Sequence, residues 1–218
     1  MAHRLKPRKE KIVKPSKITC RFQRSLVLAV MFLTLTWIGQ AHTAPTVRPF
    51  GGVTSVQLSE AFVGAVSTLN LTPGPVEPGA LVGGMAQFPI PGGGLDRETL
   101  RGDIFHVGGL SLSNQNGTAV NLFNFIIDTA SETAVLTGLV TANDDLVGRI
   151  PLFDLDLAQV QVEEAPFGLT ISGVTLLLTE PAALALNEAL GVDAFMAGFN
   201  VGVAEILALL NLSATGDQ

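Results

Sequence analysis

The hydrophobic pattern from residue 85 onward is that of short β-strands separated by turns. Alternating or β-branched runs cover residues 85–90, 102–107, 110–113, 119–128, 134–142, 149–157, 160–163 and 169–178. Turn-forming residues separate them, and the Asn116-Gly117 pair among these is the strongest short signal for a hairpin. Strands at this spacing predict a mainly β fold, an antiparallel β-sandwich or a barrel-like sheet.

Two short helices interrupt the strands, and each is introduced in the same way. A strand over residues 53–58 leads to Ser59 and Glu60, and the strand that ends at residue 178 leads to Thr179 and Glu180. A hydroxyl before an acidic first turn is the usual start of a helix. The doubling is either an internal repeat or one connector used twice. The connector is favoured because the strands in between do not repeat.

Proline and glycine set the expected limits of the strands. The segment 73–79 holds three prolines and two glycines, which predicts a loop. Pro151 lacks a backbone N–H, so its strand is expected at a sheet edge or at a strand start. The chain is expected to finish with a glycine-spaced loop and a last strand within residues 195–210.

The N-terminal segment has the pattern of an export signal. The first 24 residues carry nine Lys or Arg against one acid, and an apolar run of 13 residues follows from 26 to 38. Such a run is short of the roughly 20 residues needed to span a bilayer, and small residues follow it. Cleavage is expected after Ala41, with Ala44 as the alternative. Cys20 precedes the apolar run, which disfavours a lipoprotein; an uncleaved signal anchor remains the other interpretation.

This pattern predicts a signal peptide over residues 1–41, a mobile lead-in over 42–52 and a single domain over 53–212. The expected location of the protein is the periplasm, the cell envelope or the extracellular space. No second apolar stretch reaches membrane length, so no membrane span is expected in the mature chain.

Removal of the signal changes the charge of the chain. After residue 41 there are four arginines, no lysine and 18 acidic residues, a formal charge of −14. This charge argues against nucleic acid and anionic lipid as partners, because both require Lys or Arg to displace counterions. The same stretch has no cysteine, so its core alone must hold it together.

The side chains needed for catalysis are scarce. Only His106 is certain to remain after export, and Gly92-Gly93-Gly94 lacks the lysine of a phosphate-binding loop. No Gly-x-Ser-x-Gly elbow accompanies His106, and a single histidine without cysteine is a poor zinc site. A non-enzymatic protein is therefore expected.

His106 is the strongest candidate for a ligand-binding residue. It ends a strand and is followed by Gly108 and Gly109, which would let a ligand or another backbone come close. A histidine placed there could ligate haem iron. The alternative is a structural histidine, hydrogen-bonded at the end of its strand.

Carboxylates are the one plentiful group. Asp154 and Asp156 alternate along one strand and therefore share a face, so they are candidate ligands for a hard cation such as Ca²⁺. The alternative is a solvated sheet face. Paired carboxylates could also serve an extracellular hydrolase, the least favoured function. The scarce arginines Arg97, Arg101 and Arg149 are expected to pair with nearby acids, with an anionic ligand as the alternative.

Several motifs resemble those of secreted bacterial β-sandwich proteins of uncharacterised role. They are Phe88-Pro89-Ile90, Gly92-Gly93-Gly94, Arg101-Gly102-Asp103-Ile104-Phe105-His106-Val107-Gly108-Gly109-Leu110, Leu152-Phe153-Asp154-Leu155-Asp156, Ile171-Ser172-Gly173-Val174 and Leu178-Thr179. The resemblance covers about residues 53–205.

More remotely, the chain is similar to the HtaA-type domain of haem-uptake proteins, a β-sandwich of bacterial surfaces. That resemblance implies haem binding through a tyrosine, and this chain has none. Only His106 can be carried over as an iron ligand. The leading hypothesis is an exported, non-enzymatic protein that binds a protein partner or a small molecule. Haem capture through His106 is the alternative.

Overall fold

Every strand of the computed structural model, which describes residues 46–96 and 98–210, belongs to one antiparallel sheet of 14 strands. The elements are β1 (Thr46–Val47), β2 (Pro49–Leu58), α2 (Glu60–Thr68), β3 (Thr72–Val76), β4 (Ala80–Val82), β5 (Met85–Pro89), β6 (Gly92–Asp96), β7 (Gly102–Phe105), β8 (Gly109–Ser113), β9 (Ala119–Asp128), β10 (Val135–Ala142), β11 (Asp145–Asp156), β12 (Gln161–Ala165), β13 (Gly168–Leu178), α3 (Glu180–Leu190) and β14 (Asn200–Leu210).

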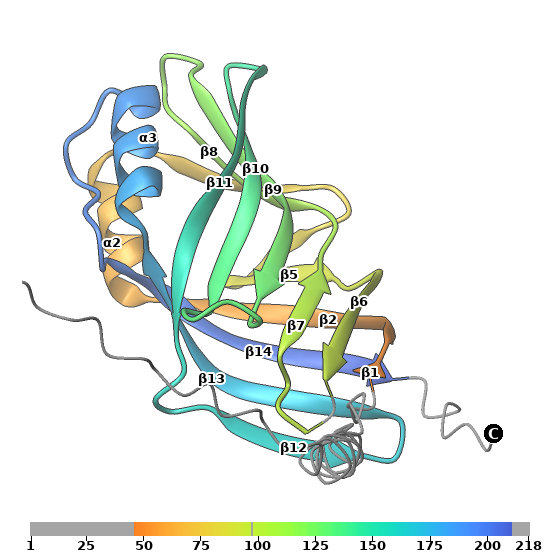
Figure 1. Ribbon diagram of the computed structural model, residues 1–218. Helices are drawn as coiled ribbons and strands as arrows, with labels where there is room; N and C mark the ends of the chain where they lie inside the picture. The colour runs from red at the N-terminus through yellow and green to blue at the C-terminus, as the bar shows by residue number, and fades with distance from the viewer. Residues whose placement is uncertain (1–45, 97, 211–218) are drawn as a thin grey trace, which may run out of the picture. The chain divides into compact units, whose positions relative to one another are not determined.

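The sheet is strongly curled, in the manner of a half-barrel (Figure 1). The main order is β1-β6-β7-β9-β10-β11-β13-β14-β2-β5-β4, with β12 on β13 and β3 joined to β9 through β8. Just after β7, the N–H of Val107 donates to the carbonyl of Pro89 at the end of β5, at 3.0 Å. The predicted fold class, mainly β and antiparallel with two short helices, is confirmed, and the sheet takes its barrel-like form.

A bulge in β9 explains why this strand is apolar on both faces in sequence. Asn124 has a φ of 51°, and the β9–β10 register shifts beside it. The inward positions change from even to odd numbers across the bulge, so Leu122, Phe125 and Ile127 are all buried. Gly138 on β10 makes room, because a Cβ there would lie 2.8 Å from the Phe125 ring.

The expectation of a loop over residues 73–79 is wrong for its first half. Residues Thr72–Val76 form β3, which pairs with β8 alone. Pro73 and Pro75 alternate along it, so both face the open side, where no N–H is needed. Pro151 obeys the same rule, since β11 pairs with β13 only from Phe153 onward.

Both predicted helix connectors are present and use the same hydrogen bonds. The Ser59 hydroxyl accepts from Phe62 N at 3.0 Å and donates to Asn200 O at 2.7 Å. The Thr179 hydroxyl accepts from Ala182 N at 3.2 Å and donates to Pro151 O at 2.7 Å. Strands β2 and β13 both pair with β14 and lead into the helices, so α2 and α3 start at the same end of the sheet.

The inside of the curl holds one hydrophobic core. Its most deeply buried large side chains are Leu95, Ile104, Val120, Leu152 and Leu178. The buried polar side chains of the described residues are Thr54, His106 and Thr179. The last of these caps α3, which leaves Thr54 and His106 as the polar pair of the interior.

The predicted signal peptide and its cleavage sites lie outside the described residues. Residues 46–52, expected as part of the lead-in, form β1 and the first part of β2. Within the described ranges, no helix has the length and hydrophobicity needed to cross a bilayer.

Candidate functional site

A groove of about 400 Å³ opens between three loops of the curled sheet. The loops join β6 to β7, β9 to β10 and β11 to β12, and residues within 99–101, 129–134 and 157–160 of these loops line the groove, together with Val162 near the start of β12. Inward-facing side chains of β7, β9, β13 and β14 line its inside: Ile104, Ile127, Ile171, Val174 and Ile206. Ligand sites of drug-sized molecules measure about 300–1,000 Å³, so the groove has the size of such a site.

Two capped turns hold the rim of the groove in place. Asp96 accepts hydrogen bonds from the Thr99 hydroxyl and backbone, both at 2.7 Å, and Asp128 accepts from the Ser131 hydroxyl at 2.8 Å. These bonds lower the pKa of both carboxyl groups, because they stabilise the ionised form. The two turns are short and self-contained.

Further hydrogen bonds tie the two turns to each other. The Thr129 hydroxyl donates to Leu100 O at 2.8 Å and accepts from Gly102 N at 3.0 Å. Arg101 donates from its guanidinium to Ala130 O, and its charge also helps to lower the pKa of Asp128. The rim is therefore preformed.

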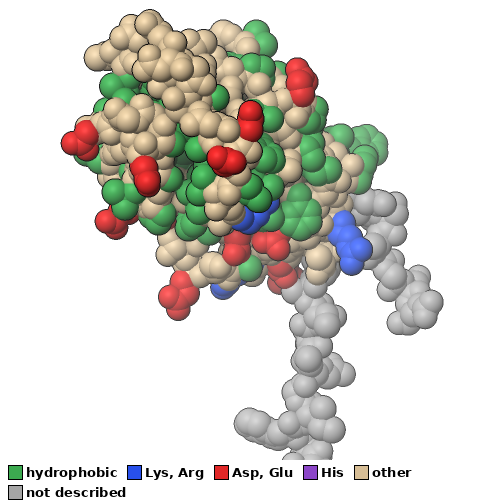
Figure 2. Space-filling model, turned by 90° about the horizontal axis from the view of Figure 1, so that it is seen from above, with side chains coloured by type: hydrophobic (Ala, Val, Ile, Leu, Met, Phe, Trp, Pro, Cys, Tyr) green, Lys and Arg blue, Asp and Glu red, His purple; other side chains and the backbone are tan. Residues whose placement is uncertain are grey.

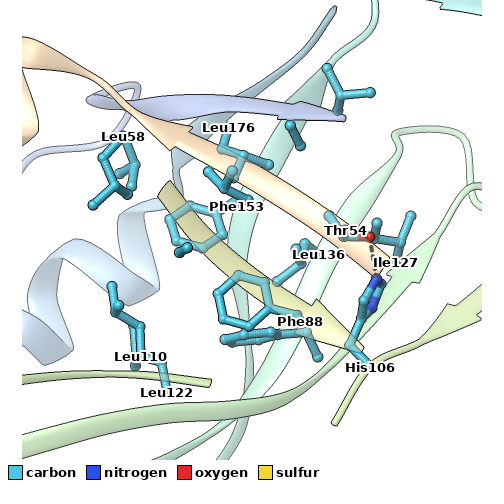
Figure 3. Close-up of a pocket in the computed structure, with 16 residues that line it drawn as sticks. Thr54, Leu58, Phe88, His106, Leu110, Leu122, Ile127, Leu136, Phe153 and Leu176 are labelled. Atoms are coloured by element: carbon cyan, nitrogen blue, oxygen red, sulfur yellow. Dashed lines mark hydrogen bonds between the residues drawn. The ribbon is translucent and has the colours of Figure 1, made fainter. Parts of the chain in front are cut away.

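A second, smaller cavity of about 50 Å³ lies inside the curl and is lined by 16 residues, of which only Thr54 and His106 are polar. Figure 3 shows this pair at one end of the cavity, with Ile127 beside it and Leu58 and Leu110 at the other end. Ile127 and Val174 line both the cavity and the groove. The two spaces therefore share a wall.

His106 is buried, with 4% of its surface exposed, and its Nε2 lies 2.7 Å from the Thr54 hydroxyl oxygen. Burial lowers its pKa to about 4, although the nearby carbonyls of Phe125 and Ile104 favour the charged ring. The ring is thus neutral at neutral pH. Neither carbonyl has hydrogen-bond geometry with Nδ1, which has no partner among the described residues.

Gly108 and Gly109 are accounted for by backbone packing. A Cβ at Gly108 would lie 2.2 Å from Gly79 N, and its φ of 76° also favours glycine. A Cβ at Gly109 would lie 2.0 Å from Leu122 O. The close approach expected from the sequence is therefore made by neighbouring strands.

Asp154 and Asp156 lie on β11 with exposed side chains, on the face away from the buried Leu155. Asp156 accepts from Ala158 N at 2.9 Å and so caps the following turn. In the described part of the chain, no group of three or more His, Cys, Asp or Glu side chains could hold a metal ion. Figure 2 shows acidic side chains scattered singly or in small groups over one face. A calcium site at Asp154 and Asp156 stays a prediction, and these two carboxylates are its proposed ligands.

The other arginines differ in what they contact. Arg149 donates to the Thr137 hydroxyl at 3.3 Å on the neighbouring strand β10. The side chain of Arg97 lies outside the described residues.

Sequence reasoning missed the groove, because its walls come from loops and strands scattered between residues 95 and 206. The available signal was the pair of sequences Asp96-x-x-Thr99 and Asp128-x-x-Ser131, which predict capped turns at two strand ends. Nothing in the sequence said that these turns lie next to each other.

Solved structures share this fold at low sequence identity. The C-terminal domain of HtaA from Corynebacterium glutamicum matches with a TM-score of 0.61 and 15% identity, over 76% of this chain and 99% of that one. A domain-swapped dimer of a histidine-to-alanine variant of that domain matches with a TM-score of 0.52 and 13% identity, over 93% and 100%. Heme binding protein HtaB from the same organism matches with a TM-score of 0.50 and 10% identity, over 77% and 96%.

The resemblance to HtaA-type domains is thereby confirmed as a distant similarity of fold. No protein-family model matches the chain, and no curated protein does.

Proposed function

We propose that this chain is an exported, non-enzymatic binding protein that takes an apolar small molecule in the groove. The observation that carries the proposal is the groove itself, about 400 Å³ with an apolar interior and a polar rim. Burial of apolar surface contributes about 25 cal/mol per Å², so this lining favours hydrophobic ligands. The hydrogen-bonded rim adds affinity because little has to be ordered when a ligand binds.

The groove has few groups for catalysis. Its polar lining consists of Thr99, Arg101, Thr129, Ser131 and Glu132. The hydroxyls of Thr99, Thr129 and Ser131 are all used in the hydrogen bonds of the rim. His106, the best candidate for a general base, lines the inner cavity and not the groove. This supports a binding protein over the hydrolase alternative.

Export supports the same proposal from the sequence. The predicted signal segment directs the chain to the envelope or beyond. There, a protein with the fold of HtaA-type domains would meet small molecules from outside the cell.

Haem is the ligand named for HtaB, and two observations bear on it here. The unpartnered, neutral imidazole of His106 has the chemistry of an iron ligand. However, the cavity beside it measures about 50 Å³, far below the size of sites for drug-sized molecules, about 300–1,000 Å³. The described lining of the larger groove contains no His, Cys, Met or Tyr. The residues therefore do not fit haem, and the apolar ligand is preferred.

The groove is tested with a neutral solvatochromic dye such as Nile red. We expect saturable binding to the mature protein, and about a tenfold weaker affinity in Val162→Asp, because a charge at the entrance opposes transfer of the dye from water. Val162 is 45% exposed, so the variant should fold. The matched control is Val147→Asp on β11, also exposed at 56% and absent from the groove lining. Equal affinities of the two variants, or no saturable binding by the wild type, would contradict the proposal.

The haem alternative has its own test. Haem added to the mature protein should give no shifted Soret band. A band that is present in the wild type and lost in His106→Ala would establish haem capture in place of the preferred function.

A further inference from the structure

The shared wall of the two spaces places the buried histidine directly behind the groove. Ile104 lines the groove, and His106 is the next inward residue along the same strand direction. Thr54 lies opposite Ile206, another groove residue, in the β2–β14 register. The Thr54–His106 pair is thus one layer of side chains deeper than the inside of the groove. Only Ile127 and Val174 line both spaces.

The hydrogen bond between this pair determines where the imidazole carries its proton. The Thr54 hydroxyl makes its one described hydrogen bond to Nε2, at 2.7 Å. A buried hydroxyl needs an acceptor for its proton, so Thr54 donates and Nε2 accepts. The neutral ring then carries its own proton on Nδ1. That N–H is buried and has no hydrogen-bond partner among the described residues, and its side chain lines an otherwise apolar cavity.

A buried donor without a partner favours any molecule that brings an acceptor to it. The acceptor has to be uncharged, because the cavity is apolar and a carboxylate would lose its hydration there. The net charge of the mature chain also opposes an anion. A ketone, quinone or ester carbonyl meets these conditions.

We infer that the ligand is an elongated, uncharged lipophile whose leading carbonyl passes between Ile127 and Val174 and accepts a hydrogen bond from His106 Nδ1–H. Its apolar remainder occupies the groove, so the inference rests on the proposed function. His106 then acts as a specificity-determining residue that selects a carbonyl-bearing lipophile over a plain hydrocarbon.

The test compares a straight-chain methyl ketone with the straight-chain alkane of equal length. Both are titrated into the mature protein while NMR follows the imidazole of His106, assigned through its contact with Thr54. We expect the ketone to move the Nδ1-bound proton downfield and to bind on the order of tenfold more tightly than the alkane, as a gained hydrogen bond predicts. The alkane should leave the imidazole resonance in place.

Two variants locate the effect. Val174→Phe narrows the passage, so ketone and alkane should bind with equal affinity and the His106 resonance should not respond. Thr54→Val removes the hydroxyl that holds the tautomer, so the preference for the ketone should fall. The wild-type spectrum decides the question even if a variant fails to fold. Ketone binding with an unchanged His106 resonance would overturn this inference and leave the proposed function intact. No saturable binding of either probe would overturn the proposed function itself.

Discussion

His106 couples the stability of the fold to pH. Its folded pKa is about 4, below the ordinary value of 6.5, because burial penalises the charged ring. The unfolded chain therefore binds a proton first as the pH falls. The stability from a neutral His106 is fully present above pH 6.5 and is lost as the pH falls toward 4.

We expect the free energy of unfolding to fall by about 3 kcal/mol between pH 7 and pH 4 through this residue alone. Urea unfolding at a series of pH values measures the slope. Asp96 and Asp128 add to the slope only near the low end of this window, because their pKa values are lowered from 3.8 and their contribution is lost as the pH falls through that value. Between pH 7 and pH 5 the slope should vanish in His106→Phe, and a slope that persists there would assign it to another group.

Alanine substitutions at two glycines should change the stability of the protein in opposite directions. A Cβ at Gly109 would lie 2.0 Å from Leu122 O, whereas one at Gly64 on α2 meets nothing within 4 Å. We expect Gly109→Ala to destabilise the protein by about 2–4 kcal/mol, because strands β8 and β9 must separate. Gly64→Ala should stabilise it by about 0.5–1 kcal/mol, since alanine has the higher helix propensity. Thermal unfolding of both variants measures this, and an unaffected melting temperature for Gly109→Ala would refute the packing role.

At the scale of elements, the recurring device is the strand that runs into a hydroxyl-capped helix. Ser59 and Thr179 each cap a helix and also donate to a carbonyl of the strand beside them. The same hydroxyl thus holds the helix start and fixes the helix to the sheet. The matching bonds make this one connection geometry that occurs twice.

We expect Ser59→Ala to destabilise the fold by about 1 kcal/mol and Thr179→Val by about 2 kcal/mol. The second effect is larger because Thr179 is buried, at 5% exposure, so its loss leaves the N–H of the buried Ala182 without an acceptor. The control is Thr68→Ala, whose exposed hydroxyl bonds only to Gly64 O within its own helix. Chemical denaturation should show the largest loss of stability for Thr179→Val, a smaller loss for Ser59→Ala and the smallest for Thr68→Ala. Equal effects of all three variants would exclude the double role of the caps.

At the scale of the whole molecule, the sequence after residue 41 carries a formal charge of −14, and the acidic side chains are scattered on the face that Figure 2 shows. A distributed negative charge responds to ionic strength and does not depend on which cation is added. A specific site, in contrast, stabilises the fold by about 2.7 kcal/mol when the cation is present at 100 times its dissociation constant.

We therefore expect CaCl₂ and NaCl at equal ionic strength to change the melting temperature by the same amount. Differential scanning calorimetry of the mature protein measures both. A larger rise with Ca²⁺ that disappears in Asp154→Asn would establish a calcium site at Asp154 and Asp156 after all.

Several features followed from the sequence because they depend on neighbours along the chain. Alternating or β-branched runs identified β9, β10, β11 and β13, and a hydroxyl followed by glutamate identified the starts of α2 and α3. The export signal stays a prediction from a local pattern, and the acidity after residue 41 is a sum over the sequence. The sequence leaves the role of His106 open, because a ligand-binding histidine and a structural histidine can both stand at the end of a strand.

The tertiary structure alone decided the rest. Strand order, the curl and the adjacency of the Asp96 and Asp128 turns depend on contacts between residues distant in sequence. The first half of the loop expected over 73–79 is a strand, because an edge strand tolerates the prolines that a central strand excludes. The sequence by itself determined the β class and the chemical sparseness of the chain. The groove near His106 forms only in the folded chain. Its walls are side chains from many strands and loops, and the sequence of any one segment does not show how these are arranged.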